Sequence, residues 1–300
     1  MILRLFVIAI FVLLACSARA QTTLYPGDIA IVGADFSTSE CNATYAGDEI
    51  IALVTFVDLT PGTTFIVTDC GFLTDAGDYM TFRASTGSAR EGAVRFTRTG
   101  ATIPANSIFY IATGEATEFC PGSANECACG WTTTPLTAIP MNFVTSSPGD
   151  QLFILQGDWQ ELPVIHQFRG RMVYAAATAP WIPGQAPLGT VGSCNTNQCS
   201  YTPPKLNCLK ADFPNLDRGV YNVNPVTTGI QGDILRAIYD VATHWSTVNV
   251  GMNCAALAAQ DMCSFNFSTL AGLNFNVIRE ELGVWKGTNS TDWYDPCNWS

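Results

Sequence analysis

Short apolar segments separated by turn residues constrain the fold of this chain more than any other feature. GDIAIVG at residues 27–33 alternates apolar residues with polar or small ones, as a half-buried strand does. EIIALVTFV at 49–57 is apolar on both faces, which suits a central strand covered on both sides. Further strand patterns occur at 92–98, 106–114, 150–158 and 273–278. Strands of this kind, joined by glycine and proline turns, predict an all-β antiparallel sandwich.

A turn and a returning strand follow the most apolar of these segments. LTPG at 59–62 predicts a turn, because proline fixes φ and glycine tolerates a positive φ. TTFIVTD at 63–69 then returns as a strand, so we expect it to form a hairpin with 49–57. In this interpretation Asp69 and Cys70 close the hairpin, and Cys70 anchors it covalently.

One helix is expected, at residues 232–245, GDILRAIYDVATHW. Apolar residues recur there at spacings of three and four, which indicates a helix with one buried face. They are Ile234, Leu235, Ile238, Val241, Ala242 and Trp245. We expect this helix to pack on an open face or end of the sandwich. Residues 178–228 are rich in proline and glycine and show little periodicity, so we expect a long loop insertion pinned by disulfides.

Residues 1–20, MILRLFVIAIFVLLACSARA, have the composition of a cleaved secretory signal: one early arginine, an apolar stretch and a small-x-small ending. The apolar stretch is shorter than the ~20 residues that cross a bilayer, so no transmembrane span is expected. Alternatively, LLAC at 13–16 is a lipobox that would leave Cys16 acylated. We expect a secreted or cell-surface protein with one sandwich domain at 21–280, and a linker or the start of a further module at 281–300.

The charge balance restricts the partners. Removing residues 1–20 deletes Arg4 and Arg19, so the formal net charge falls by two, from −11 to −13. An acidic chain repels a phosphate backbone, and no basic stripe is interleaved with aromatic residues. We therefore expect no nucleic-acid partner, whereas extracellular proteins, carbohydrates and cations stay open. The oligomeric state does not follow from the sequence.

Cysteine is abundant after the signal segment, and an exported chain is expected to oxidise its cysteines. An odd number of cysteines remains after the signal segment. Because Cys297 lies close to Ser300, this odd number would be explained if the chain is a fragment and the cysteine that pairs with Cys297 lies further along a longer parent protein. The ten disulfide candidates are Cys41, Cys70, Cys120, Cys127, Cys129, Cys194, Cys199, Cys208, Cys254 and Cys263. The connectivity stays open. Zinc binding by Cys127 and Cys129 is the alternative, but no CxxC spacing supports it.

The order of the strand segments is similar to that of a known family. GDIAIVG, EIIALVTFVDLTPGTTFIVTDCGF, EGAVRFT and SPGDQLFILQGD resemble the lamin-tail-domain type of Ig-like sandwich found on exported microbial proteins. LDRGVYN at 216–222 and HWS at 244–246 resemble later blocks of the same secreted family. The resemblance spans about residues 25–250. It implies one module of a multidomain protein and brings no catalytic residue. Cys70 replaces an asparagine of the family pattern.

The sequence lacks the GxSxG, HExxH, GxGxxG, GxxxxGK[ST] and DxDxDG motifs of common enzymes and calcium loops. A nucleophilic Cys70 with His166 or His244 as base is disfavoured, because an oxidising compartment does not keep thiols reduced. A carboxylate pair for glycoside hydrolysis stays open, since the distance between two acids in space is invisible in a sequence. We place such a pair in the loops at 115–148 or 178–228.

Three aspartates are candidate calcium ligands. Asp69, Asp75 and Asp78 fall within ten residues around a glycine-containing loop. Hard oxygen ligands from such loops suit Ca²⁺. The alternative is that these aspartates only form turns, which they favour through hydrogen bonds to their own backbone. Calcium is the one cofactor that the pattern suggests.

Two features raise the question of sugars: tryptophans that could bind them and sequons that could carry them. Trp131, Trp159 and Trp181 lie in loop-like contexts where an exposed ring could stack on a sugar, although ordinary packing is the alternative. In a eukaryotic source, N-glycosylation is expected at Asn42, Asn266, Asn289 and Asn298.

We therefore expect a non-catalytic, disulfide-stabilised binding or adhesion module of a larger extracellular protein. The alternatives are a secreted hydrolase that uses two carboxylates and a purely structural spacer.

Overall fold

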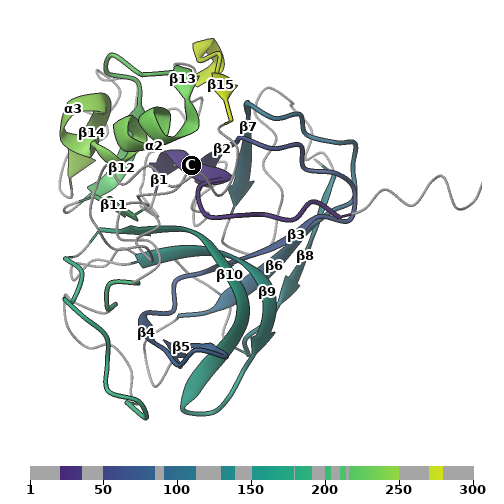
Figure 1. Ribbon diagram of the computed structural model, residues 1–300, viewed down its shortest axis with the longest axis vertical. Coiled ribbons are helices and arrows are strands. Elements are labelled where there is room, and N and C mark those ends of the chain that lie inside the picture. The colour runs from purple at the N-terminus through teal and green to yellow at the C-terminus, as the bar shows by residue number, and fades with distance from the viewer. Residues whose placement is uncertain are drawn as a thin grey trace, which may run out of the picture.

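The computed structural model describes residues 21–35, 50–84, 91–112, 130–138, 151–178, 180–190, 200–203, 210–213, 216–249 and 270–279. Two β-sheets dominate this part of the chain, with one additional strand pair and two short α-helices (Figure 1). Most strand pairs are antiparallel and the main core lies between the sheets. The predicted all-β sandwich is confirmed at this level.

The first sheet has five strands in the order β14-β12-β1-β2-β7, and every pair is antiparallel. The strands are β1 (Ile29–Asp35), β2 (Ile50–Thr55), β7 (Ser107–Ala112), β12 (Leu216–Tyr221) and β14 (Trp245–Asn249). The interior strand β2 is buried on both faces from Ile51 to Val54, as its sequence predicts. The half-buried expectation for β1 is wrong, since Ile29 to Ala34 are all buried. A helix contacts this strand and covers residues that would otherwise face water.

The second sheet has eight strands, in the order β4-β5-β10-β9-β3-β6-β8, with β11 parallel to β10. Its strands are β3 (Thr64–Thr68), β4 (Phe72–Asp75), β5 (Met80–Arg83), β6 (Ala93–Arg98), β8 (Trp131–Pro135), β9 (Gln151–Gln160), β10 (Ile165–Ala177) and β11 (Lys210–Asp212). In β6, Val94 and Phe96 are buried while Arg95 and Thr97 are half-buried, which confirms the predicted alternation.

The expected hairpin between residues 49–57 and 63–69 is wrong. Strand β2 pairs with β1 and β7, whereas β3 pairs with β6 and β9 in the other sheet. The turn itself is present, with φ at +89° for Gly62. The chain crosses between the sheets here because Phe56 and Leu59 are buried in the core that both sheets share. Leu59 also forms an isolated bridge with Ile103.

Apolar side chains of both sheets meet in the main core. Phe65 of β3 stacks on Phe96 of β6 with ring centroids 5.4 Å apart, and it meets Trp131 of β8 edge-on at 5.2 Å. Ile31 and Leu53 of the five-stranded sheet belong to the same buried cluster. The two layers are joined by Phe109 of β7 in the five-stranded sheet, whose ring meets Phe65 edge-on at 6.3 Å and stacks on Trp131 at 5.7 Å.

A second apolar cluster lies on the other face of the eight-stranded sheet, under β4 and β5. Phe82 contacts Phe72 and Phe153 edge-on, at 5.7 and 5.4 Å between ring centroids. The long strands β9 and β10 curve beside it (Figure 1). Gly157 and Gly170 face each other across these strands, and a side chain on either would clash with the opposite backbone.

The predicted helix at 232–245 is shorter than expected. Helix α2 (Gln231–Tyr239) ends before Asp240, whose side chain then accepts a hydrogen bond from Thr243 N–H in α3 (Val241–His244). The buried face is confirmed for Ile234, Leu235, Ile238 and Val241. Two positions are corrected: Ala242 is exposed, and Trp245 is buried as the first residue of β14. Pairing with β12 keeps that segment extended.

The expected loop insertion at 178–228 contains sheet strands. β11 and β12 lie within it, and β12 is an interior strand of the five-stranded sheet. β13 (Thr228–Ile230) begins at its end and pairs in parallel with β15 (Asn276–Ile278), which follows the 3₁₀ turn Leu270–Gly272. These strands were missed because they are short and carry few consecutive apolar residues, so a nonlocal partner decides their conformation. Figure 1 shows this pair and the helices at one end of the molecule.

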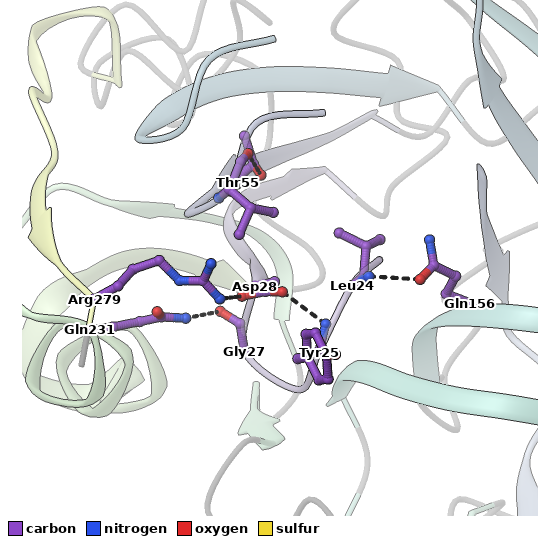
Figure 2. Close-up of polar contacts among 9 residues, drawn as sticks. Leu24, Tyr25, Gly27, Asp28, Thr55, Gln156, Gln231 and Arg279 are labelled. Carbon is purple, nitrogen blue, oxygen red and sulfur yellow. Dashed lines mark hydrogen bonds and ion pairs between the residues drawn. The ribbon is translucent and has the colours of Figure 1, made fainter. Parts of the chain in front are cut away.

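The segment before β1 is fastened to distant parts of the chain (Figure 2). Leu24 N–H donates to Gln156 Oε1 of β9 at 2.6 Å. Asp28, only 1% exposed, accepts from Tyr25 N–H and forms an ion pair of 2.7 Å with Arg279, next to β15. Burial raises the pKa of Asp28, while the Tyr25 N–H and the charge of Arg279 oppose that rise. These contacts join the two chain ends of the described domain.

In the described part of the chain, neither helix has the length and apolar character that crossing a membrane requires.

Candidate functional site

The turn between β3 and β4 packs against the residues that lead into β6. Asp69 is buried, and its Oδ1 accepts a hydrogen bond of 2.5 Å from Gly92 N–H. In return, the Glu91 carboxyl group accepts a hydrogen bond from Gly71 N–H. The thiol of Cys70 lies 3.5 Å from Gly92 O. Through these contacts with Gly92, Asp69 and Cys70 fix the position of Gly92 and of the preceding residue, Glu91.

A cavity of about 380 Å³ lies beside Glu91, and we call it the Glu91 cleft. Its described lining comes from the end of β5, the lead into β6, the residues after β8, the connection from β9 to β10, and β10 itself. The lining residues are Ala84, Glu91, Thr137, Ala138, Glu161, Leu162, Pro163 and His166. A cavity of this size holds one small ligand or the end of a larger one.

Glu91 is the unusual residue of the cleft. Its Oε2 atom is buried and has no hydrogen-bond partner in the described part of the chain. Burial raises the pKa of Glu91 from 4.5 to about 7, although the Gly71 N–H and the charge of Arg83 oppose the rise. Near pH 7 this carboxyl group is therefore present in both protonation states, and it can donate or accept a proton.

His166 supplies a second titratable group, on β10. Its side chain is buried, and Nδ1 lies 3.4 Å from Leu162 N–H, which donates to it. The ring lies 5.3 Å from that of Trp159. Burial lowers the pKa of His166, while the carboxylate of Glu161 opposes that change. The ring is thus neutral at pH 7, with its proton on Nε2 because Nδ1 is the acceptor.

Glu161 places a second carboxyl group at the cleft and is exposed. Its Oε1 accepts a hydrogen bond of 2.9 Å from Ala138 N–H, which ties the residues after β8 to the connection between β9 and β10. Among the described lining residues there is no lysine or arginine. The cleft therefore combines carboxyl groups, a neutral imidazole and apolar walls.

The three predicted calcium ligands have different surroundings. Asp69 is buried and engaged with Gly92, Asp75 ends β4 and accepts from Gly77 N–H at 2.9 Å, and Asp78 is exposed before β5. Over the described ranges, no group of three or more His, Cys, Asp or Glu side chains is placed to hold a metal ion. The bond between Asp75 and Gly77 N–H is the turn-forming role that the alternative expects, whereas Asp69 bonds to a residue distant in the sequence. Calcium binding by this set stays a prediction.

Several predicted features lie outside the described residues. They are the signal segment 1–20 with Cys16, the C-terminal segment 281–300 with Cys297, the four sequons Asn42, Asn266, Asn289 and Asn298, and the disulfide candidates other than Cys70. Cys70 itself is fully buried in the second apolar cluster. Disulfide pinning stays a prediction.

The candidate residues for thiolate chemistry lie in different settings. Cys70 precedes β4, and His166 is on β10. His244 ends α3, where Nδ1 lies 3.0 Å from Asn224 O and the ring faces Tyr221 of the five-stranded sheet. His244 therefore lies beside the five-stranded sheet, whereas Cys70 and His166 belong to the side of the eight-stranded sheet.

The tryptophans proposed for sugar stacking are mostly buried. Trp131 lies in β8 and Trp159 in β9, so the loop-like contexts expected for them are wrong. Trp131 and Trp181 are buried, and Trp159 is half-buried against His166 and Phe82. Ordinary packing explains Trp131 and Trp181.

In comparisons with known proteins, no family model, no curated protein and no solved structure matches this chain. The similarity to the lamin-tail sandwich therefore stays a prediction. Glu91 begins the segment EGAVRFT and Glu161 lies outside any motif, so neither glutamate stands out in the sequence as a candidate site residue. The signal that reveals Glu91 is its burial, which depends on the distant turn at Asp69 to Gly71.

Proposed function

We propose that this protein is a non-catalytic extracellular binding module, and that the Glu91 cleft is its ligand site. The observation that carries the proposal is the buried Oε2 of Glu91, which has no hydrogen-bond partner among the described residues. Buried polar atoms in proteins are almost always paired, so an exception needs an explanation, such as a catalytic role or a bound water or ion. A ligand held in the adjoining cavity would supply that partner.

The proposal also includes that the protein is exported and that its sandwich is of the Ig-like type. The composition of residues 1–20 supports export. The order of segments that resembles a lamin-tail sandwich supports a module of a larger secreted or surface protein, whose partner is a protein or a carbohydrate. Thr22 N–H donates to Thr63 Oγ1 at 3.1 Å, so residues soon after the expected signal segment are already part of the folded domain.

A second candidate function is a hydrolase that uses two carboxyl groups in the same cleft. It is favoured by the pKa of Glu91, raised to about 7, together with the carboxyl group of Glu161 on the same cavity. A proton donor of this kind beside a second carboxylate is the chemistry of glycoside hydrolysis. Both residues lie outside the loops at 115–148 and 178–228, where the sequence suggested an acid pair.

One experiment separates the two functions. The secreted full chain is applied to a glycan and peptide array and to a panel of glycosidase and esterase substrates, together with the Glu91→Gln variant. Binding without turnover, lost in the variant, is the expected result. Turnover that the variant abolishes would establish the hydrolase instead. The Asp158→Asn variant removes one charge from an exposed site on β9 and serves as the matched control. Silence in both assays would favour a structural spacer and contradict the proposal.

A further inference from the structure

We propose that the Glu91 cleft binds a primary ammonium group, carried by a small organic amine or by a lysine side chain. This inference rests on the proposed function and names the ligand class of the same site. It combines the charge of the lining, the unpaired carboxyl oxygen and the apolar walls.

The charge of the cleft selects against anions. Glu91 and Glu161 are the charged residues among the described lining, and the whole chain has a formal net charge of −11. His166 adds no positive charge at neutral pH, because burial lowers its pKa. Anionic ligands would be repelled, whereas cations are attracted by both the cleft and the surrounding protein.

The buried oxygen of Glu91 requires a donor. Gly71 N–H donates to the carboxyl group and Arg83 lies close enough to act on its charge, yet Oε2 has no partner among the described residues. An ionised carboxylate in such a position is costly unless it is paired with a cation and hydrogen-bonded. A ligand ammonium group offers both a positive charge and three N–H donors.

The remaining lining suits the carbon chain of an amine. Ala84, Ala138, Leu162 and Pro163 present apolar surface beside the carboxyl groups. A divalent metal ion fits less well, because Ca²⁺ takes about six to eight oxygen ligands and the described lining has two carboxyl side chains. A neutral polyol could form hydrogen bonds but would not neutralise the buried charge.

Binding of a cation would change the protonation of the cleft. The charged groups near Glu91 are Arg83 at the end of β5, Asp69 after β3, and Glu161 and His166 around the start of β10. An alkylammonium ion keeps its charge up to about pH 10 and favours ionised Glu91. At pH 7 the bound complex should therefore release about half a proton, and affinity should rise from pH 6 to pH 8.

Titration calorimetry on the full chain tests the proposal. The probes are n-butylammonium chloride, its neutral analogue n-butanol, and Nα-acetyl-lysine N-methylamide as a protein side chain. We expect both amines to bind at least about tenfold more tightly than butanol, a difference of about 1.4 kcal/mol. The relative affinity of the two amines identifies the source, a free amine or a lysine side chain. Heats measured in buffers of different ionisation enthalpy should show the proton release.

The variants and the pH series make the outcomes decisive. Glu91→Gln should weaken amine binding about tenfold or more, whereas the control Asp158→Asn should leave it nearly unchanged. Circular dichroism confirms that each variant is folded, and the pH series needs only the wild-type protein. Equal affinity for butanol, amine affinity that falls from pH 6 to pH 8, or full amine binding by folded Glu91→Gln would overturn the proposal. If array ligands depend on Glu91 while amines do not bind, the ligand class is wrong and the binding function stands.

Discussion

Glu91→Gln should make the protein more stable in alkaline solution, and the size of this effect follows from the burial of the side chain. The variant keeps an amide oxygen that can accept from Gly71 N–H, and it removes the titratable group. In the wild-type protein burial raises the pKa of Glu91 from 4.5 to about 7. A group whose pKa rises on folding stabilises the fold below its unfolded value, and that stabilisation is lost as the pH rises through the folded value.

The size of this change in the free energy of unfolding is set by the difference between the pKa values of Glu91 in the unfolded and folded states. Each pH unit between 4.5 and about 7 corresponds to about 1.4 kcal/mol, so ionising Glu91 should lower the free energy of unfolding by about 3.5 kcal/mol at most. At pH 4 the wild-type protein and Glu91→Gln should therefore have similar stability. At pH 8.5 the variant should be more stable by about 2 to 3 kcal/mol.

Urea denaturation followed by tryptophan fluorescence, with disulfides left unreduced, measures the two proteins at both pH values. Asp158→Asn replaces an exposed carboxyl group on β9 by an amide and serves as the matched control for the substitution itself. If the difference between Glu91→Gln and wild type does not change with pH, the carboxyl group is not buried in the way described. A variant that is less stable at pH 8.5 would refute the argument outright.

Two further substitutions test the fold around the site. Arg279→Ala leaves the buried Asp28 carboxylate without its ion pair and should lower the free energy of unfolding by about 2 kcal/mol. The loss is smaller than for a fully buried pair, because Arg279 is half-exposed. Adding Asp28→Asn to this variant should restore stability, which urea denaturation measures. Gly157→Ala should cost more than about 2 kcal/mol, since its Cβ would clash with Arg169 O on β10. Gly184→Ala, with φ at +81° and open space around it, is the matched control and should cost only about 1 kcal/mol. Equal losses for the two glycine variants would mean that the close approach of β9 and β10 is wrong.

Local patterns predicted the identity of several strands and much of the core. The uniform apolar run of β2 and the alternation of Val94 and Phe96 with Arg95 and Thr97 in β6 are periods that short stretches carry by themselves. The buried face of α2 is likewise encoded at spacings of three and four. These strands and the buried helix face could be predicted from the sequence because each depends on residues that are neighbours in the chain.

Partners distant in the sequence decided what those patterns could not. Trp245 continues a helical spacing, but pairing with β12 makes it the first residue of β14. The turn after β2 resembles that of a hairpin, yet β3 joins β6 and β9 because the core takes Phe56 and Leu59 between the two sheets. A turn signal indicates that the chain changes direction, and it does not specify which strand it will meet.

The sequence by itself determined an acidic, cysteine-rich chain built from short strands, since composition and periodicity are properties of the chain alone. Only the tertiary structure decided that the carboxyl group of Glu91 is buried beside a cavity and has a raised pKa. Its pKa depends on how much water surrounds it, and that is set by the turn at Asp69 to Gly71 and by the residues after β8 and β9. Because solvation depends on contacts between residues far apart in the chain, the sequence around Glu91 does not reveal the environment of its carboxyl group.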